Sequence, residues 1–142
     1  MRRVVPDTNV WIDWLNTGRH ETVLLSRDSV KYLSAIVLID LYAGAGSPGD
    51  RRHVRRLHHV FQRTRRIILP TVATIADAGQ LLHHFRWLDG EGRSRQAGFS
   101  HNVLLALSAR QVGATVLTSN AADFERIRAL ARFELEVLSP AA

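Results

Sequence analysis

Four small polar residues stand in apolar surroundings at widely separated points of the chain. They are Asp7, Asp40, Asn102 and Asp123. Asp40 interrupts the apolar stretch 36–41, and Asp7 directly follows a short apolar run. Carboxylate and amide groups are costly to bury in such surroundings unless something compensates them. A shared divalent cation is a frequent compensation for converging carboxylates, so the four residues are candidates for one metal site.

The donor atoms of these residues indicate which chemistry the site could support. Oxygen donors with no histidine among them favour Mg²⁺ or Mn²⁺ over zinc. Such ions can turn a water into a nucleophile and neutralise the leaving oxygen when a phosphodiester is cleaved. Each residue could instead cap a helix; Asp123, for example, lies beside Ser119 and Asn120 at an expected helix start. Their joint placement favours a site.

The elements that must position these residues follow from hydrophobic periodicity and from glycine and proline signals. Strands are expected at residues 3–6, 32–33, 67–69 and 115–118, with an edge strand at 135–138. Helices are expected at 10–15, 21–27, 34–43, 50–66, 71–85 and 100–112, with a short one around Asp123. This alternation predicts an α/β fold of three layers (α/β/α) around a central, mostly parallel sheet of four to five strands.

In such a fold the four residues are expected to meet at one edge of the sheet. Sites in parallel sheets form outside the carboxyl ends of the strands. Asp7 follows the first strand directly, and Asp123 comes shortly after strand 115–118. Asn102, near the start of its helix, and Asp40, one or two turns into its own, can point to the same rim.

Composition limits the class of protein. A length of 142 residues suits a single domain covering residues 1–142. The absence of cysteine excludes disulfides, zinc–thiolate sites and cysteine nucleophiles, and fits a reducing compartment. No apolar run approaches the roughly 18 residues of a membrane span, and the N-terminus does not read as a signal peptide. A cytoplasmic protein without membrane association is therefore expected.

The charge of the chain indicates a polyanionic partner. The net charge is +6, and Lys31 is the single lysine among 19 basic residues. Arginine suits bidentate phosphate contacts, and neutralising phosphates releases counterions. The stripe from Arg51 to Arg66 is the strongest candidate for attracting phosphates at long range, although an ordinary solvated surface explains it nearly as well.

Three stretches of sequence carry a resemblance to a known family. They are Val4-Val5-Pro6-Asp7-Thr8-Asn9-Val10-Trp11, Ala35-Ile36-Val37-Leu38-Ile39-Asp40-Leu41-Tyr42-Ala43-Gly44, and Asn102-Val103-Leu104-Leu105-Ala106 with Gly113-Ala114-Thr115-Val116-Leu117-Thr118-Ser119-Asn120-Ala121-Ala122-Asp123-Phe124. In this order and spacing they resemble PIN-domain nucleases, and more narrowly the VapC toxins of bacterial toxin–antitoxin pairs. The resemblance spans roughly Val4 to Leu138.

The resemblance implies a function and a set of site residues. It implies an endoribonuclease dependent on Mg²⁺ or Mn²⁺, homodimeric, and neutralised by a VapB-like antitoxin. The implied acidic quartet is Asp7, Asp40, Asn102 and Asp123, with Thr8, Ser119 and Asn120 as supporting polar residues.

Two of the quartet positions depart from the family pattern. Asp40 stands where glutamate is usual, so its carboxylate is one methylene shorter. Asn102 stands where aspartate is usual; it keeps the shape, removes a negative charge and cannot act as a base. A natural weak enzyme, a non-catalytic family member and an engineered inactive variant would all carry this residue.

Other residues are candidates for contacts with partners. Arg93, Arg95 and His101 precede Asn102 and are candidates for holding the RNA backbone. Trp11, Trp14 and Leu15 either pack in the core or line a groove for an antitoxin segment, as the resemblance implies. Two rival functions stay open: a non-catalytic RNA- or antitoxin-binding module, and a structure-specific DNA nuclease with the same type of site.

Overall fold

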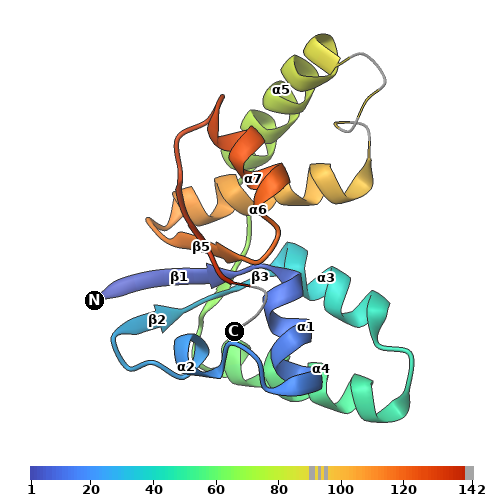
Figure 1. Ribbon diagram of the computed structural model, residues 1–142, viewed down its shortest axis with the longest axis vertical. Helices are drawn as coiled ribbons and strands as arrows, with labels where there is room; N and C mark the ends of the chain where they lie inside the picture. The colour runs from blue at the N-terminus through green and yellow to red at the C-terminus, as the bar shows by residue number, and fades with distance from the viewer. Residues whose placement is uncertain (90–91, 93, 95, 140–142) are drawn as a thin grey trace.

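A four-stranded parallel sheet runs through the centre of the computed structural model, which describes residues 1–89, 92, 94 and 96–139 (Figure 1). In spatial order, the strands are β2 (Ser29–Lys31), β1 (Arg2–Pro6), β5 (Thr115–Thr118) and β6 (Glu134–Val137). A second, two-stranded parallel sheet is formed by β3 (Leu33–Ser34) and β4 (Ile67–Ile68). The predicted parallel sheet of four to five strands is confirmed, with four strands.

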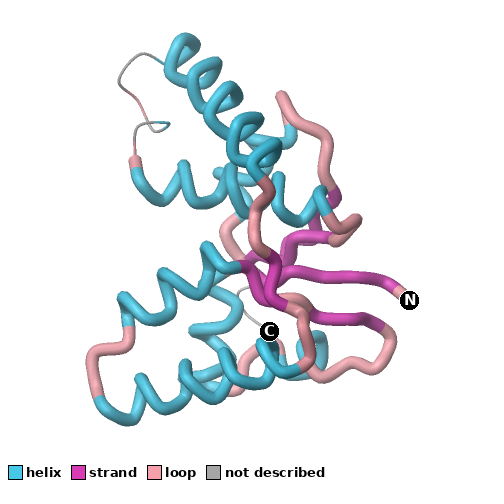
Figure 2. The backbone as a smooth tube through the Cα atoms, turned by 180° about the vertical axis from the view of Figure 1, so that it is seen from behind, coloured by secondary structure: helices cyan, strands magenta, loops and turns pink. Residues whose placement is uncertain are grey.

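Helices cover both faces of the sheet. They are α1 (Thr8–Thr17), α2 (Glu21–Leu24), α3 (Ala35–Gly44), α4 (Pro48–Arg63), α5 (Val72–Asp89), α6 (Ala97–Gln111) and α7 (Ala121–Arg128). In Figure 1, α5, α6 and α7 lie on one side of the sheet, and α1, α2 and α4 lie on the other. Figure 2 shows the same two helical layers from behind. The chain therefore has the predicted α/β/α architecture.

Two details of the strand prediction were wrong. The strand expected at 67–69 pairs with β3 rather than with the central sheet. The strand expected at 32–33 divides around Tyr32, whose backbone N–H donates to the carbonyl oxygen of Val4 (2.9 Å). Residues before Tyr32 therefore pair with β1, and residues after it pair with β4.

Several helix boundaries also differ from the prediction, for local reasons. The second helix is a single turn that ends at Leu24. Helix α4 begins two residues early because the Ser47 side chain accepts the N–H of Asp50 (3.0 Å) and caps it. It ends at Arg63, two residues before Arg65 takes a left-handed conformation (φ 58°). Helix α6 begins at Ala97, so Asn102 lies in its second turn instead of at its start.

Side chains at the ends of two strands cap the helices that follow them. Asp7 is the N-cap of α1, and its side chain accepts the backbone N–H of Thr8 (2.7 Å). Ser34 caps α3 by accepting the N–H of Ile36 (3.1 Å). Both caps lie at carboxyl ends of strands, so each helix leaves its sheet at the rim where the candidate residues were expected.

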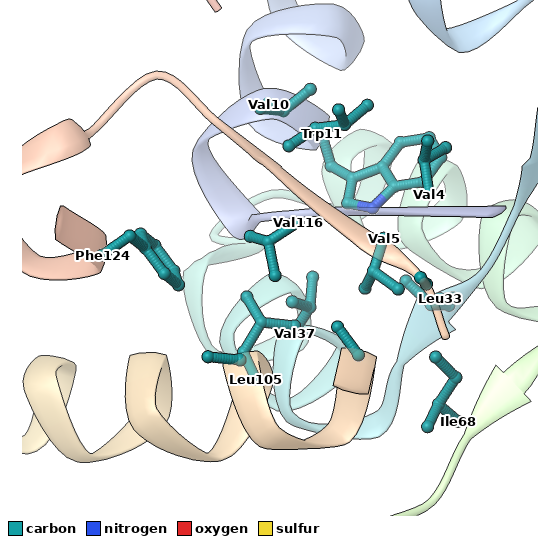
Figure 3. Packing of buried hydrophobic residues seen from close by; sticks show 14 of the residues in the cluster. Val4, Val5, Val10, Trp11, Leu33, Val37, Ile68, Leu105, Val116 and Phe124 are labelled. Atoms are coloured by element: carbon teal, nitrogen blue, oxygen red, sulfur yellow. The ribbon is translucent and has the colours of Figure 1, made fainter. Parts of the chain in front are cut away.

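Side chains from the helices pack on both faces of the central strands, so these strands are apolar on both faces. Val5 and Val116, neighbours in β1 and β5, are completely buried, and Leu105 of α6 packs over them (Figure 3). Trp11 of α1 covers the opposite side of the same strands. Strands buried on both faces lose the alternation of polar and apolar residues, which is why they appear in the sequence as continuous apolar runs. Among the described residues, no helix has the length and apolarity needed to span a membrane.

Candidate functional site

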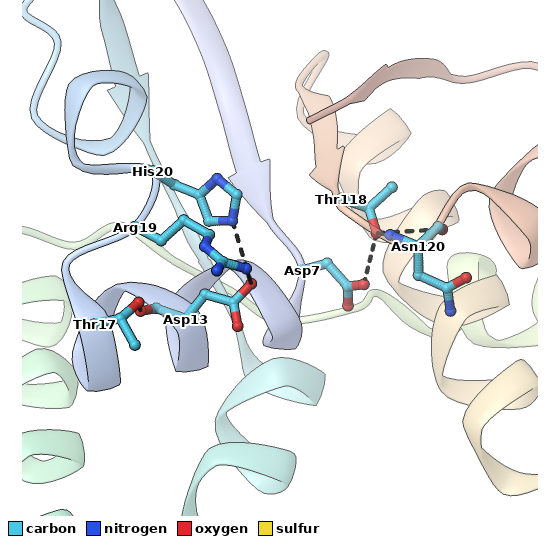
Figure 4. A network of polar contacts seen from close by, with 7 residues as sticks. All are labelled: Asp7, Asp13, Thr17, Arg19, His20, Thr118 and Asn120. Carbon is cyan, nitrogen blue, oxygen red and sulfur yellow. Dashed lines mark hydrogen bonds and ion pairs between the residues drawn. The ribbon is translucent and has the colours of Figure 1, made fainter. Parts of the chain in front are cut away.

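Asp7 lies at the carboxyl end of β1 and is almost completely buried. Its backbone N–H donates to the carbonyl oxygen of Leu117 (2.7 Å), which extends the pairing of β1 with β5 by one residue. Of its carboxylate oxygens, Oδ1 accepts the N–H of Thr8 (2.7 Å) and Oδ2 accepts the hydroxyl of Thr118 (3.0 Å; Figure 4). The first member of the quartet is thus fixed by the ends of two neighbouring strands.

Thr118 is a site residue that the sequence analysis missed. It is the last residue of β5 and is fully buried. Its hydroxyl donates to Asp7 and accepts the backbone N–H of Asn120 (3.0 Å). A hydroxyl at the end of an apolar strand, just before the polar pair Ser119–Asn120, is the signal that could have identified it.

Asp40 projects from α3 toward two other elements. Its carboxylate lies 3.0 and 3.3 Å from Nδ1 of His101 on α6, and the hydroxyl of Thr8 donates to it at 3.3 Å. About a third of the Asp40 side chain is exposed. Asp40 is therefore the open member of the quartet, whereas Asp7 is the enclosed one.

Asn102 and Asp123 form the remaining pair. The Asn102 amide nitrogen on α6 donates to Oδ2 of Asp123 at 3.1 Å. Asp123 lies in the first turn of α7 and is 4% exposed. The N-cap position of α7 belongs to Asn120, so Asp123 is not the N-cap residue. Its charge still interacts favourably with the N-terminus of α7.

The carboxylates of the quartet lie close enough to affect one another. The pKa of Asp7 is raised above its ordinary value, chiefly because burial disfavours the charged form. Hydrogen bonds from Thr118 and Thr8 act in the opposite direction, and repulsion from Asp40 and Asp123 raises the pKa further. A cation among these groups would relieve that repulsion.

The chemistry of the donors fits a hard divalent cation, although they do not surround a common point. Among the described residues, no group of three or more histidine, cysteine, aspartate or glutamate side chains is arranged to hold a metal ion. The quartet offers oxygens from three carboxylates and one amide, which is the donor type that Mg²⁺ and Mn²⁺ prefer. Carboxylate oxygens that already accept one hydrogen bond keep further lone pairs for an ion. Binding would require Asp40 and Asn102 to leave or share their present hydrogen bonds.

The supporting and RNA-contact residues named from the sequence have different surroundings. Thr8 and His101 contact Asp40 directly. Asn120 contributes its backbone N–H to the hydroxyl of Thr118. Ser119 is partly buried and lies between Thr118 and Asn120 in the chain. Arg93 and Arg95 lie outside the described residues, so their roles stay predictions.

A groove separate from the quartet lies between α1, α2 and α4. It has a volume of about 460 Å³, and its walls include Trp11, Trp14, Leu24, Leu57, Val60 and Phe61. Trp11 is buried and packs edge-on against Trp14, with ring centroids 6.0 Å apart. Trp14 and Leu15 are half-buried and face the same groove. Trp11 therefore belongs to the core and, with Trp14 and Leu15, also lines this groove; an antitoxin segment as the occupant of the groove stays a prediction.

Basic side chains border this groove. Lys31, Arg56 and Arg66 line its edge. The pKa of Lys31 is lowered by burial and by the charge of Arg66, so Lys31 and Arg66 are close enough to repel each other. The rest of the predicted stripe on α4, including Arg51, Arg52, Arg55 and His59, is exposed.

Comparison with known proteins identifies the family. The PIN domain family matches residues 4–130, which is most of the chain. The protein belongs to the PIN domain family. No match was found among curated proteins.

Solved structures show the same fold at low sequence identity. Similar chains occur in VapBC2 from Rickettsia felis bound to a fragment of its promoter DNA (22% identity, TM-score 0.68, 96% of this chain and 99% of that one). A similar chain occurs in DNA-bound VapBC from Salmonella typhimurium (21% identity, TM-score 0.69, 96% of this chain and 98% of that one). Another occurs in VapBC-1 from nontypeable Haemophilus influenzae (18% identity, TM-score 0.68, 95% of this chain and 97% of that one). The likeness extends over nearly the whole length of each chain.

Proposed function

We propose that this protein is a metal-dependent endoribonuclease, the toxin of a VapBC-like toxin–antitoxin pair, with activity weakened by Asn102. The observation that carries the proposal is the gathering of three acids and one amide from four separate elements at the carboxyl edge of the sheet. PIN domains are generally nucleases, which gives this cluster a reaction class. Hydrolysis of a phosphodiester is the reaction that oxygen ligands and Mg²⁺ or Mn²⁺ perform well.

Each residue of the quartet has a proposed role. Asp7 and Asp123, the buried acids, are the main ligands for the ion, and Asp40 orients the attacking water or a second ion. The Asn102 carbonyl oxygen can complete the ligand set. When bound, the ion supplies activation of water and charge neutralisation at the phosphate. Thr118 fixes the Asp7 carboxylate, so this ligand is oriented before any ion arrives.

Asn102 is the reason to expect weak activity. Its amide adds no negative charge to hold a divalent ion, and it cannot accept a proton. It also donates to Asp123, and this hydrogen bond competes with metal binding for a lone pair of that carboxylate. The same hydrogen bond favours the second candidate function, a non-catalytic module that keeps the fold and binds RNA or the antitoxin.

The groove supports an antitoxin partner. Aromatic and aliphatic walls with a basic edge suit an amphipathic segment with one apolar face and acidic flanks. Three of the similar structures are VapBC complexes. The substrate phosphates are proposed to contact Arg93 and Arg95, helped by long-range attraction from the α4 stripe.

We also propose a cytoplasmic homodimer, with residues 1–142 as a single domain. The start of α5 and the turn before it expose three large apolar side chains, Leu69, Val72 and Ile75 (70%, 84% and 53% exposed). Large apolar side chains exposed close together in sequence are candidates for a protein contact. Substituting Val72 with glutamate should shift the protein toward the monomer in sedimentation equilibrium. An unchanged sedimentation profile would remove this surface from the proposal.

RNA cleavage provides the direct test. Labelled RNA and matched single-stranded DNA are incubated with Mn²⁺ and either the native chain or Asn102→Asp. We expect slow RNA cleavage by the native chain and at least a tenfold faster reaction by the variant, abolished by EDTA and by a second substitution, Asp7→Asn. A preference for DNA would favour the structure-specific DNA nuclease. An inert Asn102→Asp variant that still binds RNA or antitoxin would favour the non-catalytic module.

A further inference from the structure

The geometry points to His101 as a positioning residue that holds the Asp40 carboxylate in the site. This inference rests on the proposed function for its catalytic meaning, although the contact itself can be tested separately. It gives His101 a role different from the phosphate contact that its place in the sequence suggested.

The first support is the contact itself. Nδ1 of His101 lies 3.0 Å from one oxygen of Asp40 and 3.3 Å from the other, so the ring faces both oxygens of the carboxylate. The residues are 61 positions apart and come from α6 and α3. An ionised carboxylate can only accept hydrogen bonds, so Nδ1 carries the proton and donates.

A neutral His101 ring that donates to Asp40 has no second N–H to offer to an RNA phosphate. With its proton on Nδ1, a neutral imidazole has a lone pair on Nε2. A phosphate oxygen requires a donor, which this nitrogen does not then provide. Neutral His101 can therefore orient Asp40, but it cannot at the same time donate a hydrogen bond to the RNA backbone.

The third support is the arrangement of neighbours on α6. Consecutive helical residues point about 100° apart, so adjacent side chains reach different elements. His101 reaches Asp40 on α3, and Asn102 reaches Asp123 on α7. One turn of α6 thus connects Asp40 and Asp123 to a single rigid element.

Asp40 has a specific need for such a partner. Its side chain is a third exposed, and a carboxylate at an open edge can adopt several rotamers. Among the described residues its hydrogen-bond donors are His101 and Thr8, and the Thr8 contact is the longer one (3.3 Å). His101 therefore makes the shortest of the contacts that restrain this carboxylate, and it reaches both carboxylate oxygens.

The test separates the contact from its consequence for metal binding. In the native chain, ¹⁵N NMR of the histidine rings should show His101 protonated at Nδ1, and Asp40→Ala should shift it toward the tautomer protonated at Nε2. An Nδ1 without a proton in the native chain would overturn the inference, whatever the protein does with metal or RNA.

Mn²⁺ affinity, followed by EPR of the free ion, is the second readout and uses an Asn102→Asp background. We expect His101→Leu to weaken Mn²⁺ binding about tenfold, the usual effect of losing an orienting partner. His101→Asn keeps a donor near the position of Nδ1 and should restore most of the affinity. His83→Leu, on the exposed face of α5, is the matched control and should bind as the parent does.

The Mn²⁺ measurements can contradict either the role of His101 or the metal-dependent function. If His101→Leu binds Mn²⁺ as tightly as the parent, His101 does not position Asp40 for the ion and the inference fails. If the parent itself binds no Mn²⁺, the metal-dependent function fails instead, and the ring tautomer alone decides whether His101 holds Asp40.

Discussion

The hydroxyl of Thr118 lies 3.0 Å from Oδ2 of Asp7 and connects the carboxyl ends of the two central strands. The residues are 111 positions apart in sequence, yet the pairing of β1 with β5 brings them together. Thr118 also accepts the N–H of Asn120, so the same hydroxyl shapes the turn that leads into α7 and Asp123. A single buried side chain therefore links the positions of both buried acids.

Removing the Thr118 hydroxyl should destabilise the fold. Thr118→Val keeps the shape but leaves a carboxylate oxygen and a backbone N–H without their partner, at an expected cost of about 1–3 kcal/mol. Urea unfolding measures this cost. Thr118→Ser retains the hydroxyl and is the control for the site: it should bind Mn²⁺ as the native chain does, whereas Thr118→Val should bind it more weakly. Equal Mn²⁺ affinity of the two variants would contradict the role of Thr118.

Replacing Asp7 should stabilise the metal-free protein in a pH-dependent way. The pKa of Asp7 is raised in the folded state above the ordinary value of 3.8, so its ionised form opposes folding. The contribution of Asp7 is therefore most favourable below pH 3.8 and is lost as the pH rises through the folded pKa. Asp7→Asn, which can still cap α1, should increase the free energy of unfolding by about 1 kcal/mol at pH 7.

Measuring unfolding over a range of pH separates the effect of the Asp7 charge from other effects of the substitution. Unfolding of both proteins is measured in EDTA from pH 3.5 to pH 8, and the difference between them should shrink toward acid pH. A difference that stays constant across the series would show that the effect has a cause other than the charge on Asp7. Asp7→Asn should also abolish any metal-dependent cleavage.

Restoring an acid at position 102 should make stability depend on metal. Asn102→Asp removes the hydrogen bond to Asp123 and adds a like charge beside it, so the melting temperature in EDTA should fall below that of the native chain. Mn²⁺ should raise the melting temperature of the variant by several degrees and that of the native chain much less, because only an ion that binds the folded state stabilises it. Equal shifts in the two proteins would mean that Asn102 does not limit metal binding.

A charge placed in the groove should prevent partner binding without unfolding the protein. Val60 lines the groove and is 46% exposed, so Val60→Glu should leave the fold intact while placing in the apolar wall a charge that a bound partner would have to desolvate. Affinity for the proposed antitoxin should fall at least a hundredfold in calorimetry. Leu130→Glu, at a similarly exposed site after α7 (43%), should bind normally. Loss of binding in both variants, or in neither, would contradict the groove.

Much of the fold followed from local signals in the sequence. The apolar runs around Val5 and Val116 predicted buried strands, and Gly18, a residue type that favours helix ends, adopts the left-handed conformation at the end of α1 (φ 73°). These features depend on a few neighbouring residues, which is why they can be recognised without a structure. The two-stranded sheet was not predicted because strands of two residues carry no periodicity and their partners lie far along the chain.

For the site, residue types alone identify the right chemistry: three carboxylates and one amide, each near an expected strand end or within an expected helix. How these four residues are paired follows from the packing of the folded chain. That packing enclosed Asp7 with Thr118, left Asp40 at the open edge with His101, and joined Asn102 to Asp123. Residue type and helix position are local properties, whereas a hydrogen bond between α6 and α3 depends on packing of the whole domain to within a fraction of an ångström.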